Sequence, residues 1–440
     1  MYKKIAFILI IVLATAAAGF VLGDFIYSSR RFPPNTFIEN IEVSGLSVGE
    51  VIRILSKADV DSSCAKNIML FSSSEVYEFV PSEIGSYIKP RSTAYSAFKA
   101  AYKSNYLKSL VKRVIGLERR KVLTLRLGVD NEVAGPIVKD IAGRINVASV
   151  EARCILLGEG KYKLTDEKIG SRVDEPQTIL LLGESLALGR KTSPLIIVED
   201  PPRVFRADLE EHPPIHSIGR YRTRYGYHDD PNRIHNIKLL SSVISNHIIL
   251  PDETFSFLKA AGDISGSKGY KEALVIVGGE LMPQYGGGAC QVATTLYNAA
   301  MYADLDILRR RNHAIYFFIY PLGRDAAIYP DSLDMKFKNN TGHPVMVRTY
   351  ATGSSLTIAL YGTPTGKTVS FSTAKIIERR PGLFSYEISR DKFDFNVPFT
   401  TIVEKFVHKN GKLISSKEIK SHYSFAGESE NGRTASTGSE

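Results

Sequence analysis

The pattern of apolar and polar positions begins with one long apolar run. Residues 5–23 contain no charged side chain, and roughly 20 consecutive apolar residues span the hydrocarbon core of a bilayer as a helix. Lys3 and Lys4 precede the run, which favours a cytoplasmic tail at residues 1–4 and an external body. Small residues at 16–18 are also typical of a signal-peptide cleavage site, but the run continues past them. The pattern predicts a single transmembrane anchor at 5–23, with a cleaved signal peptide as the alternative.

Beyond the anchor, short β-type segments alternate with segments of helical periodicity, which predicts an α+β body. The helical pattern predicts helices at 131–145, at 175–189, at about 233–246 and from Cys290 onward. The strand-like pattern predicts hairpins or strands at 66–88, 121–130, 151–174, 193–200, 314–320, 333–339, 344–350, 355–362 and 396–419. In the last of these, Asn410 and Gly411 mark the turn of a hairpin.

Changes in this pattern divide the chain into sections, and 440 residues are too many for one compact domain. We expect a linker at 24–40, an α+β domain at 41–200, a linker at 201–221, a second α+β domain at 222–364, a C-terminal β section at 365–424 and a disordered tail at 425–440.

The charge distribution adds one candidate binding surface. The chain has a formal net charge of +10, and residues 91–126 contain ten Lys or Arg residues and a single acid, Glu118. Aromatic and aliphatic residues recur at helical spacing there, which predicts a basic amphipathic helix. Such a helix could bind an anionic wall polymer or anionic lipid, or it could be a solvated helix face. Because the body is expected outside the cell, we expect no nucleic acid as a partner.

Three cysteines, Cys64, Cys154 and Cys290, leave at least one thiol unpaired. The sequence has no C-x-x-C motif and no cluster of Cys and His residues, so we expect no metal site. Cys64 lies in a polar turn and Cys154 in an alternating strand, and neither has activating neighbours. Cys290 differs because it follows three glycines at the start of a predicted helix.

The segment QYGGGACQVATTLY, residues 284–297, therefore presents the main candidate for chemistry. Glycines allow backbone conformations closed to other residues and a close approach of substrate. The free N–H groups and the dipole of a helix N-terminus lower the pKa of a thiol and can stabilise an oxyanion. We predict that Cys290 is a nucleophile, although a turn before a buried thiol is the alternative. The predicted oxyanion or substrate-binding residues are Gly286, Gly287, Gly288, Arg324 and the rival side-chain donors Gln284 and Gln291.

A nucleophilic cysteine requires a base, and His313 is the candidate because it follows the cysteine helix at the start of a predicted strand. A hydrogen-bonded histidine at a strand end is the structural alternative. Two acids could orient the imidazole: Asp325 in the turn GRDA is the predicted residue, and Asp334 at the head of the next strand is the alternative. The order of Cys on a helix, then His and Asp on strands, resembles papain-like and transglutaminase-like cores.

Four segments of the second domain resemble the VanW family in the same order, over about residues 222–362. They are NRIHNIKLLSSVISNHIILPDETFSF, GGGACQVATTLYNAA, YPLGRDAAI and DMKFKNNTGHPVMV. Ala289 departs from the larger aliphatic residue that family members often carry there. The earlier segments EVSGLSVGE, VPSEIGSYI and LTDEKIGSRVD are similar to the peptidoglycan-binding domain that often precedes VanW. The resemblance implies a membrane-anchored protein of the cell envelope, and some VanW-bearing proteins are taken to be cysteine L,D-transpeptidases.

The combined fold prediction is an α+β chain. It has a single N-terminal transmembrane helix, an α+β wall-binding domain, a papain-like or transglutaminase-like α+β VanW core and a small C-terminal β section. The body is expected on the outer side of the cell membrane, facing the wall, with peptidoglycan and the membrane as partners.

The combined functional prediction is a cysteine acyltransferase acting on peptidoglycan stem peptides, in the first place an L,D-transpeptidase that forms a thioester on Cys290. A cysteine peptidoglycan hydrolase is one alternative, because the thioester could pass to water instead of an amine. A wall-binding protein without enzymatic activity, or an accessory to vancomycin (glycopeptide) resistance, is another. The predicted chemistry requires no cofactor.

Overall fold

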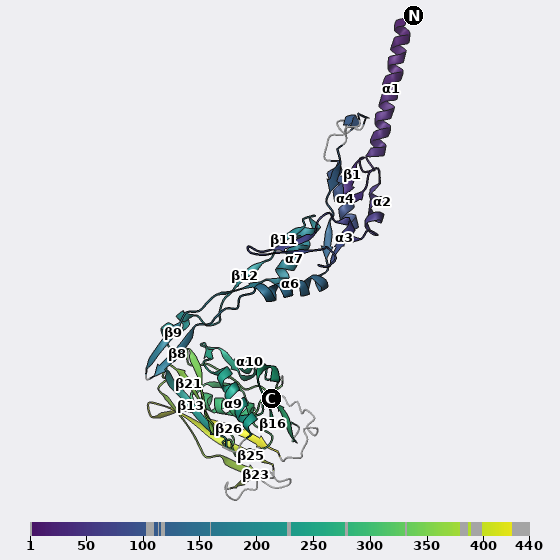
Figure 1. The fold of residues 1–440 in the computed structure, drawn as a ribbon. Helices are drawn as coiled ribbons and strands as arrows, with labels where there is room; N and C mark the ends of the chain where they lie inside the picture. The colour runs from purple at the N-terminus through teal and green to yellow at the C-terminus, as the bar shows by residue number, and fades with distance from the viewer. Residues whose placement is uncertain are drawn as a thin grey trace. The chain divides into compact units, whose positions relative to one another are not determined.

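The computed structural model describes residues 2–102, 110–112, 114–115, 119–158, 160–226, 230–277, 280–330, 332–378, 386–388 and 398–424. The tail predicted to be disordered, 425–440, lies outside these residues. The chain divides into two compact units, which we call the N-terminal unit (1–149 and 169–201) and the C-terminal unit (150–168 and 202–440). Both units contain helices and strands, so the predicted α+β class is confirmed (Figure 1).

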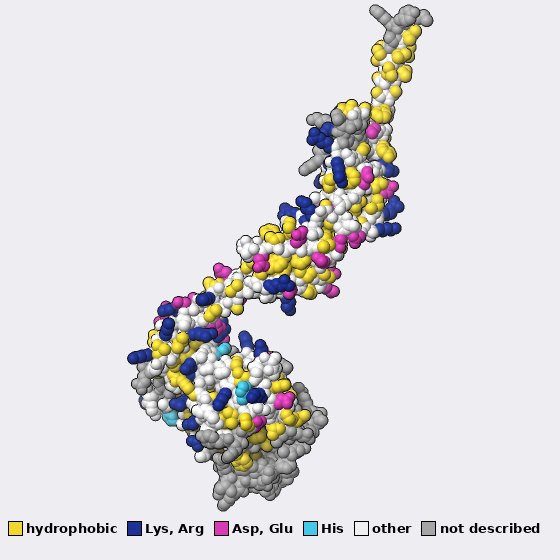
Figure 2. Space-filling view, in the orientation of Figure 1, with side chains coloured by type: hydrophobic (Ala, Val, Ile, Leu, Met, Phe, Trp, Pro, Cys, Tyr) yellow, Lys and Arg dark blue, Asp and Glu magenta, His cyan; other side chains and the backbone are white. Residues whose placement is uncertain are grey.

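The chain begins with the long helix α1 (Tyr2–Ser28). Residues 7–28 of this helix are long and apolar enough to cross a membrane, a property that a signal sequence near an N-terminus shares. Apolar side chains cover the described part of α1 on the face shown in Figure 2. The end of α1 is held by the N-terminal unit, because the hydroxyl of Tyr102 donates hydrogen bonds to the carbonyl oxygens of Ser28 and Arg31.

The N-terminal unit consists of short strands and helices around one apolar core. The paired strands are β2 (Ile41–Glu42), β1 (Thr36–Ile38) and β6 (Lys121–Leu123); β11 (Thr192–Pro194), β3 (Ile68–Phe71) and β4 (Val76–Phe79); β5 (Ser86–Ile88) and β7 (Leu127–Val129); and β10 (Gly170–Val173) and β12 (Ile197–Asp200). The helices are α2 (Val48–Leu55), α3 (Val60–Ser63), α4 (Pro90–Ala101), α6 (Asn131–Ile145) and α7 (Glu175–Ala187). Residues 24–40, expected to be a linker, contribute the end of α1, strand β1 and the buried Phe32 and Ile38.

The two later helices of this unit coincide closely with the predicted segments. α6 has the bounds predicted from periodicity, and its N-cap Asp130 accepts a hydrogen bond from the N–H of Glu132, as N-cap residues do. α7 ends two residues before the predicted 189. These helices have a local signature because their buried residues recur every three or four positions along the same segment.

The predicted strand at 121–130 is wrong as a single element, because it forms two strands, β6 and β7, that belong to different sheets. Between the two strands, the N–H groups of Leu125 and Arg126 donate to side-chain oxygens of Glu39 and Thr93. These side chains satisfy the backbone in place of a neighbouring strand, so the ladder is interrupted there.

The basic segment 91–126 is described only in part. α4 buries Thr93, Ala94, Ala97 and Ala101, so one face of this helix packs on the unit's core. Residues 103–109, 113 and 116–118 lie outside the described part of the chain. Binding of an anionic wall polymer or lipid through 91–126 therefore stays a prediction.

The C-terminal unit is built around the helix α11 (Ala289–Tyr302), in which every residue except Cys290 and Tyr302 is buried. The antiparallel sheet β13 (His216–Arg224), β21 (Ser355–Gly362), β20 (Val345–Ala351) and β14 (Ile248–Ile249) packs beside it. A Cβ atom on Gly219 of β13 would lie 2.4 Å from the carbonyl oxygen of Ala299, so glycine permits the close approach of helix and sheet. The other elements are β8 (Arg153–Gly158), β9 (Lys161–Thr165), α8 (Arg206–Glu210), α9 (Pro231–Ile244), β15 (Thr254–Ser256), α10 (Phe257–Ala261), η1 (Gly266–Lys268), β16 (Glu272–Val277), β17 (Glu280–Tyr285), β18 (Asp306–Arg309) and β19 (Lys336–Lys338).

The C-terminal β section forms an antiparallel sheet in the same unit. Its strands are β22 (Lys367–Phe371), β23 (Lys375–Glu378), β24 (Tyr386–Ile388), β25 (Phe399–Lys409) and β26 (Lys412–Tyr423). Asn410 and Gly411, which join β25 to β26, both have positive φ angles, 53° and 74°. This is the conformation that favours an Asn-Gly turn, so the predicted hairpin is present.

The predicted strand at 314–320 is absent, and this segment forms turns and loops instead. All seven residues of this segment are apolar or aromatic, but several of their rings pack against other rings rather than into a sheet. Phe317 contacts the ring of His313, and Tyr316 contacts Tyr423 of β26. The aromatic pattern of this segment therefore reflects its tertiary surroundings and not strand pairing.

Candidate active site

The glycine turn before Cys290 has little space for side chains and a backbone that favours glycine. Gly286 and Gly288 have φ angles of 82° and 106°. A Cβ atom on Gly286 would lie 2.2 Å from a side-chain carbon of Ile264, and one on Gly287 would lie 2.7 Å from the Cβ of Ala273. Substitution of any of the three glycines would therefore move the start of α11.

Asn236 of α9 holds this turn by hydrogen bonds to its backbone. Its side-chain amide donates hydrogen bonds to the carbonyl oxygens of Gly287 and Lys271, at 3.2 and 2.8 Å, and its oxygen accepts from the N–H of Lys271. Asn236 is fully buried, so these bonds also satisfy polar groups that water cannot reach. The turn is thus fixed by a residue about fifty positions earlier in the chain.

Cys290 is the second residue of α11, behind the N-cap Gly288. The N–H of Ala289 donates to the carbonyl oxygen of Gly286, and that of Gln291 donates to Gly288, both at 3.0 Å. Among the described residues, the N–H groups of Gly288 and Cys290 have no hydrogen-bond acceptor. These two groups are available to an oxyanion beside the sulfur.

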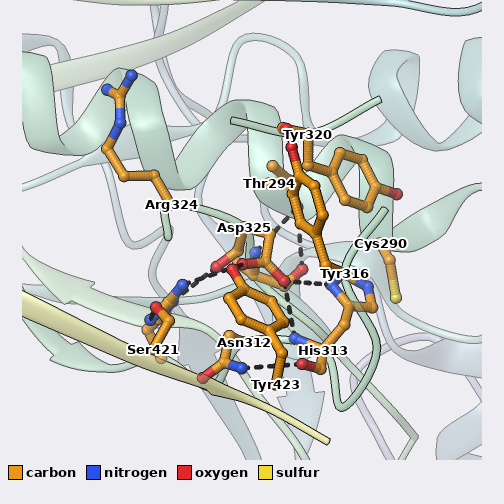
Figure 3. A network of polar contacts seen from close by, with 12 residues as sticks. Cys290, Thr294, Asn312, His313, Tyr316, Tyr320, Arg324, Asp325, Ser421 and Tyr423 are labelled. Atoms are coloured by element: carbon orange, nitrogen blue, oxygen red, sulfur yellow. Dashed lines mark hydrogen bonds and ion pairs between the residues drawn. The ribbon is translucent and has the colours of Figure 1, made fainter. Parts of the chain in front are cut away.

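The side chain of His313 lies beside the sulfur of Cys290 (Figure 3). Burial disfavours the thiolate, but a hydrogen bond and the positive charge of His313 outweigh burial and lower the pKa of Cys290 below its usual value. The sulfur also lies 3.5 Å from the carbonyl oxygen of Ile328. Cys290 as a residue is partly buried.

His313 is held on its other side by Asp325. The Nδ1 atom of His313 lies 2.6 Å from Oδ2 of Asp325, and the same oxygen accepts a hydrogen bond from the backbone N–H of His313 at 2.7 Å. Tyr320 stacks on the imidazole, with ring centroids 5.2 Å apart. Burial alone would lower the pKa of His313, but the bonds to Asp325 and Cys290 raise it to about 9. The arrangement favours a thiolate on Cys290 next to an imidazolium on His313.

Asp325 is 2% exposed and lies among hydrogen-bond donors. Besides the two bonds from His313, its Oδ1 atom accepts from Arg310 at 3.2 Å and from the hydroxyl of Tyr423 at 2.6 Å. Burial favours the neutral acid, but these donors lower the pKa of Asp325, with His313 contributing most. A carboxylate with this many partners is fixed in orientation, which also fixes the imidazole.

The structure does not bring the other predicted side chains to the sulfur. Asp334 accepts hydrogen bonds from Ser256 and from the N–H of Leu258, so it holds the start of α10 and does not orient His313. Arg324 points away from the cysteine (Figure 3). Its guanidinium lies 4.2 Å from the ring centroid of Phe371 and near two further rings, those of Tyr221 and Tyr302.

The two glutamines also have different surroundings. Gln291 is fully buried, and its amide nitrogen donates to Thr223 and to the carbonyl oxygen of Arg224 while its oxygen accepts from Arg233. With its amide engaged in this way, Gln291 joins α11 to β13 and α9. Gln284 lies on β17, paired with Ala273 of β16, and has no hydrogen bond to the thiol.

The two remaining cysteines differ from Cys290. Burial raises the pKa of Cys154, and it also raises that of Cys64 although Lys191 lies 3.4 Å from the sulfur. Among the described residues, no group of three or more His, Cys, Asp or Glu side chains could hold a metal ion.

Three positioning residues were missed by the sequence reasoning: Asn236, Arg310 and Tyr423. Asn236 lies in a segment that resembles the VanW family, but its neighbours in the sequence do not indicate a role for it. Arg310 is one of three consecutive arginines, which read as ordinary surface charge. Tyr423 lies 98 positions after Asp325, so only the folded chain reveals the contact.

Comparison with known families agrees with the motifs. Residues 232–361 match the family described as "VanW like protein", and residues 77–192 match the family described as "Putative peptidoglycan binding domain". The chain therefore contains a VanW-family domain preceded by a domain of the peptidoglycan-binding family, which confirms the predicted resemblance.

Two relatives share part of this chain. It is 36% identical over 186 residues to the "Uncharacterized protein YoaR" of Bacillus subtilis, covering 42% of this chain and 60% of that relative. It is 31% identical over 115 residues to the "Vancomycin B-type resistance protein VanW" of Enterococcus faecalis, covering 25% of this chain and 42% of that relative. The chain thus spans less than two thirds of each relative's length. No solved structure matches it.

Proposed function

We propose that this protein is a cysteine acyltransferase of the cell envelope that acts on peptidoglycan stem peptides, with L,D-transpeptidation as its main reaction. The observation that carries the proposal is the line of contacts from Cys290 through His313 to Asp325. A thiol with a lowered pKa, at the start of a helix and beside an oriented imidazole, has the parts that nucleophilic acyl transfer requires.

In the first half of the reaction, the thiolate of Cys290 attacks the carbonyl carbon of the donor peptide. The C–S bond forms, the carbonyl electrons move to oxygen, and the N–H groups of Gly288 and Cys290 stabilise the oxyanion. When the C–N bond breaks, the imidazolium of His313 gives its proton to the leaving amine. The products are a thioester on Cys290 and a terminal amino acid.

In the second half, an amine of a neighbouring stem peptide attacks the thioester. The neutral imidazole of His313 takes the proton of this amine, and the thiolate of Cys290 leaves. Water in place of the amine gives hydrolysis, so the acceptor decides between a transpeptidase and a hydrolase. Asp325 keeps the imidazole in one tautomer throughout, with Nε2 toward the reacting atoms.

Peptidoglycan is the proposed substrate because the family that matches residues 77–192 is named for binding it. α1 supports a location at the outer face of the membrane, because residues 7–28 could span a bilayer and the helix continues without a break through residues 16–18. The end of the helix is also held by Tyr102. We therefore propose a retained anchor, with the two units facing the wall.

The test is incubation of the full-length protein, in detergent, with purified disaccharide-tetrapeptide, followed by mass spectrometry. We expect cross-linked dimers that have lost one terminal alanine, and no dimers with Cys290→Ala. Shortened monomers without dimers, still dependent on Cys290, would identify a hydrolase. Products that form equally with Cys290→Ala would exclude the thiol mechanism.

A second candidate is a wall-binding protein without enzymatic activity, associated with glycopeptide resistance. The match to a peptidoglycan-binding family and the name of the Enterococcus relative favour it. The two candidates differ in their need for a thiol. If Cys290→Ser pellets with purified wall as well as the wild type and neither protein forms products, binding is the function.

A further inference from the structure

We infer that the C-terminal β section is part of the active site, and that Tyr423 of β26 is a positioning residue for the pair formed by Asp325 and His313. This inference rests on the proposed function, because it concerns the same thiol. It assigns a role to a section of the chain that lies beyond residues 232–361, which match the VanW family.

The first argument is the contact itself. The hydroxyl of Tyr423 donates to Oδ1 of Asp325 at 2.6 Å and accepts from the N–H of Gly323 at 3.1 Å. Tyr423 is 2% exposed, and its ring stacks on Phe399 of β25 with centroids 4.9 Å apart. Burial and the nearby carboxylate raise the pKa of Tyr423, so the hydroxyl keeps its proton and remains a donor.

The second argument is that the two oxygens of the Asp325 carboxylate have different hydrogen-bond donors. Oδ2 of Asp325 accepts both bonds from His313, while Oδ1 accepts from Tyr423 and Arg310. Tyr423 and Arg310 therefore hold the oxygen that His313 does not use. Without the hydroxyl, Oδ1 loses one of its two donors in a buried place, where an unsatisfied acceptor is costly. The carboxylate then becomes free to turn or to gain a proton.

The third argument is that the β section binds the whole turn that carries Asp325. Ser421 of β26 donates to the carbonyl oxygen of Gly323 at 2.9 Å and accepts from Arg310 at 2.8 Å. Gly323 has a φ of 77°, and a Cβ atom on it would lie 2.7 Å from the hydroxyl of Thr401 in β25. The β strands and this turn are thus closely fitted to each other.

The fourth argument is that the β section is attached to the core at other points as well. At the end of α11, Asp304 forms ion pairs with Lys367 of β22 and Lys405 of β25, at 2.8 and 2.6 Å. The N–H of Ser424 donates to the carbonyl oxygen of Ala314 at 2.7 Å, next to His313. These contacts hold β26 in place independently of the hydroxyl of Tyr423.

The consequence concerns the charge of the thiol. The ionisable groups that face Asp325 are His313, Arg310, Tyr423 and Tyr297, and those that face His313 also include Cys290 and Tyr320. Removing the hydroxyl of Tyr423 weakens the anionic form of Asp325, which then stabilises the imidazolium less. The imidazolium in turn stabilises the thiolate less. We expect the midpoint of the Cys290 titration to rise.

The experiment measures alkylation of Cys290 by iodoacetamide in the full-length protein as a function of pH, with the modified peptide followed by mass spectrometry. Tyr423→Phe keeps the ring and its stacking but removes the hydroxyl. We expect its titration midpoint to rise by about one pH unit, which corresponds to a roughly tenfold smaller ionisation constant of the thiol. Tyr225→Phe is the matched control, because its buried hydroxyl donates to the carbonyl oxygens of Thr352 and Ser355 and does not contact Asp325.

Two further variants separate positioning from a general loss of structure. Ser421→Ala removes the bridge between Gly323 and Arg310 and should raise the midpoint by less than Tyr423→Phe does. In an Asp325→Asn background, Tyr423→Phe should cause no further change, because the hydroxyl acts only through the carboxylate.

The outcomes distinguish this inference from the proposed function. A wild-type midpoint as high as that of an ordinary thiol would contradict the proposed function itself. A low wild-type midpoint that Tyr423→Phe and Ser421→Ala leave unchanged would overturn only the role of the β section. An equal shift in Tyr225→Phe would also overturn it, because the effect would then not be specific to Asp325.

Discussion

Cys64 in the N-terminal unit and Cys290 in the C-terminal unit each lie beside a basic side chain, yet their thiols respond in opposite ways. Lys191 is 3.4 Å from the sulfur of Cys64, and His313 hydrogen-bonds to Cys290. Burial is the largest influence on both thiols and disfavours the thiolate in both. Nevertheless, the pKa of Cys64 is raised and that of Cys290 is lowered.

The difference lies in what surrounds the basic partner. Glu39 and Asp61 oppose the effect of Lys191 on Cys64, which is also the C-cap of α3, the negative end of a short helix. Cys290 lies in the first turn of the longer α11, and Asp325 stabilises the positive charge of its partner. A nearby cation is therefore insufficient to activate a thiol. At Cys64, burial outweighs the effect of Lys191, whereas at Cys290 the hydrogen bond and the charge of His313 outweigh burial.

The largest effect is expected on enzymatic activity, when each of the two cysteines is replaced in turn. Cys290→Ala should reduce transpeptidation or hydrolysis by about 10⁴–10⁶-fold, because the nucleophile is removed. Cys64→Ala should leave the rate unchanged, since this thiol faces no acyl-transfer machinery. The measurement is product formation from disaccharide-tetrapeptide. Equal loss in both variants would mean that the comparison reflects folding and not chemistry.

The next largest effect is expected when the carboxylate that supports the basic partner of Cys290 is removed. Asp325→Asn keeps the size of the side chain but removes its charge, and we expect a loss of about 10³–10⁴-fold in kcat/KM. Steady-state kinetics with the same substrate measures it.

Asp334→Asn is the matched control for this change. Asp334 accepts two hydrogen bonds at the start of α10, and Asn offers one acceptor oxygen in place of two, so its substitution should reduce stability by about 1 kcal/mol and leave kcat/KM unchanged. If Asp334→Asn reduced activity as much as Asp325→Asn, Asp325 would not be the residue that orients His313.

A smaller effect compares the two thiols directly in the wild-type protein. At pH 7, iodoacetamide should modify Cys290 at least about tenfold faster than Cys64, since the pKa of Cys290 is lowered and that of Cys64 is raised. Peptide mapping by mass spectrometry gives both rates from one sample. In urea the two rates should become equal, because both effects depend on the folded surroundings. A preference for Cys64 in the native protein would reverse the comparison.

The smallest effect is the dependence of the rate on pH. The reactive form has a thiolate on Cys290 and a proton on His313. Because the pKa of Cys290 is lowered, activity should persist to a lower pH than the ordinary pKa of a thiol allows, and it should fall in more acidic solution. Because the pKa of His313 is raised to about 9, activity should fall again as the pH rises through 9. The profile of kcat/KM against pH measures both limits, at about tenfold per unit beyond each. An alkaline limit near pH 6.5 would show that Asp325 does not support the imidazolium.

Elements with a local signature were predictable from the sequence. The helix α6 and the hairpin of β25 and β26 follow from apolar spacing and from the Asn-Gly turn, which depend on neighbours within a few residues. The prediction of a strand at 314–320 was wrong, because a short apolar and aromatic run fits a buried strand and a loop packed on rings equally well. Only the presence of His313 and Tyr423 beside it decides between the two.

The same distinction applies to the candidate site. The sequence by itself indicated Cys290, the glycine turn and His313, because a glycine run before a helix is a local pattern with a direct chemical meaning. It named Asp325 with Asp334 as the alternative, and it named Arg324 as a possible substrate-binding residue. The tertiary structure distinguished them through residues far away in the chain: Tyr423 and Arg310 converge on Asp325, while Phe371 and two other rings surround Arg324. The physical reason is that hydrogen bonds and charges act over a few ångströms in space, whatever the number of residues between their partners.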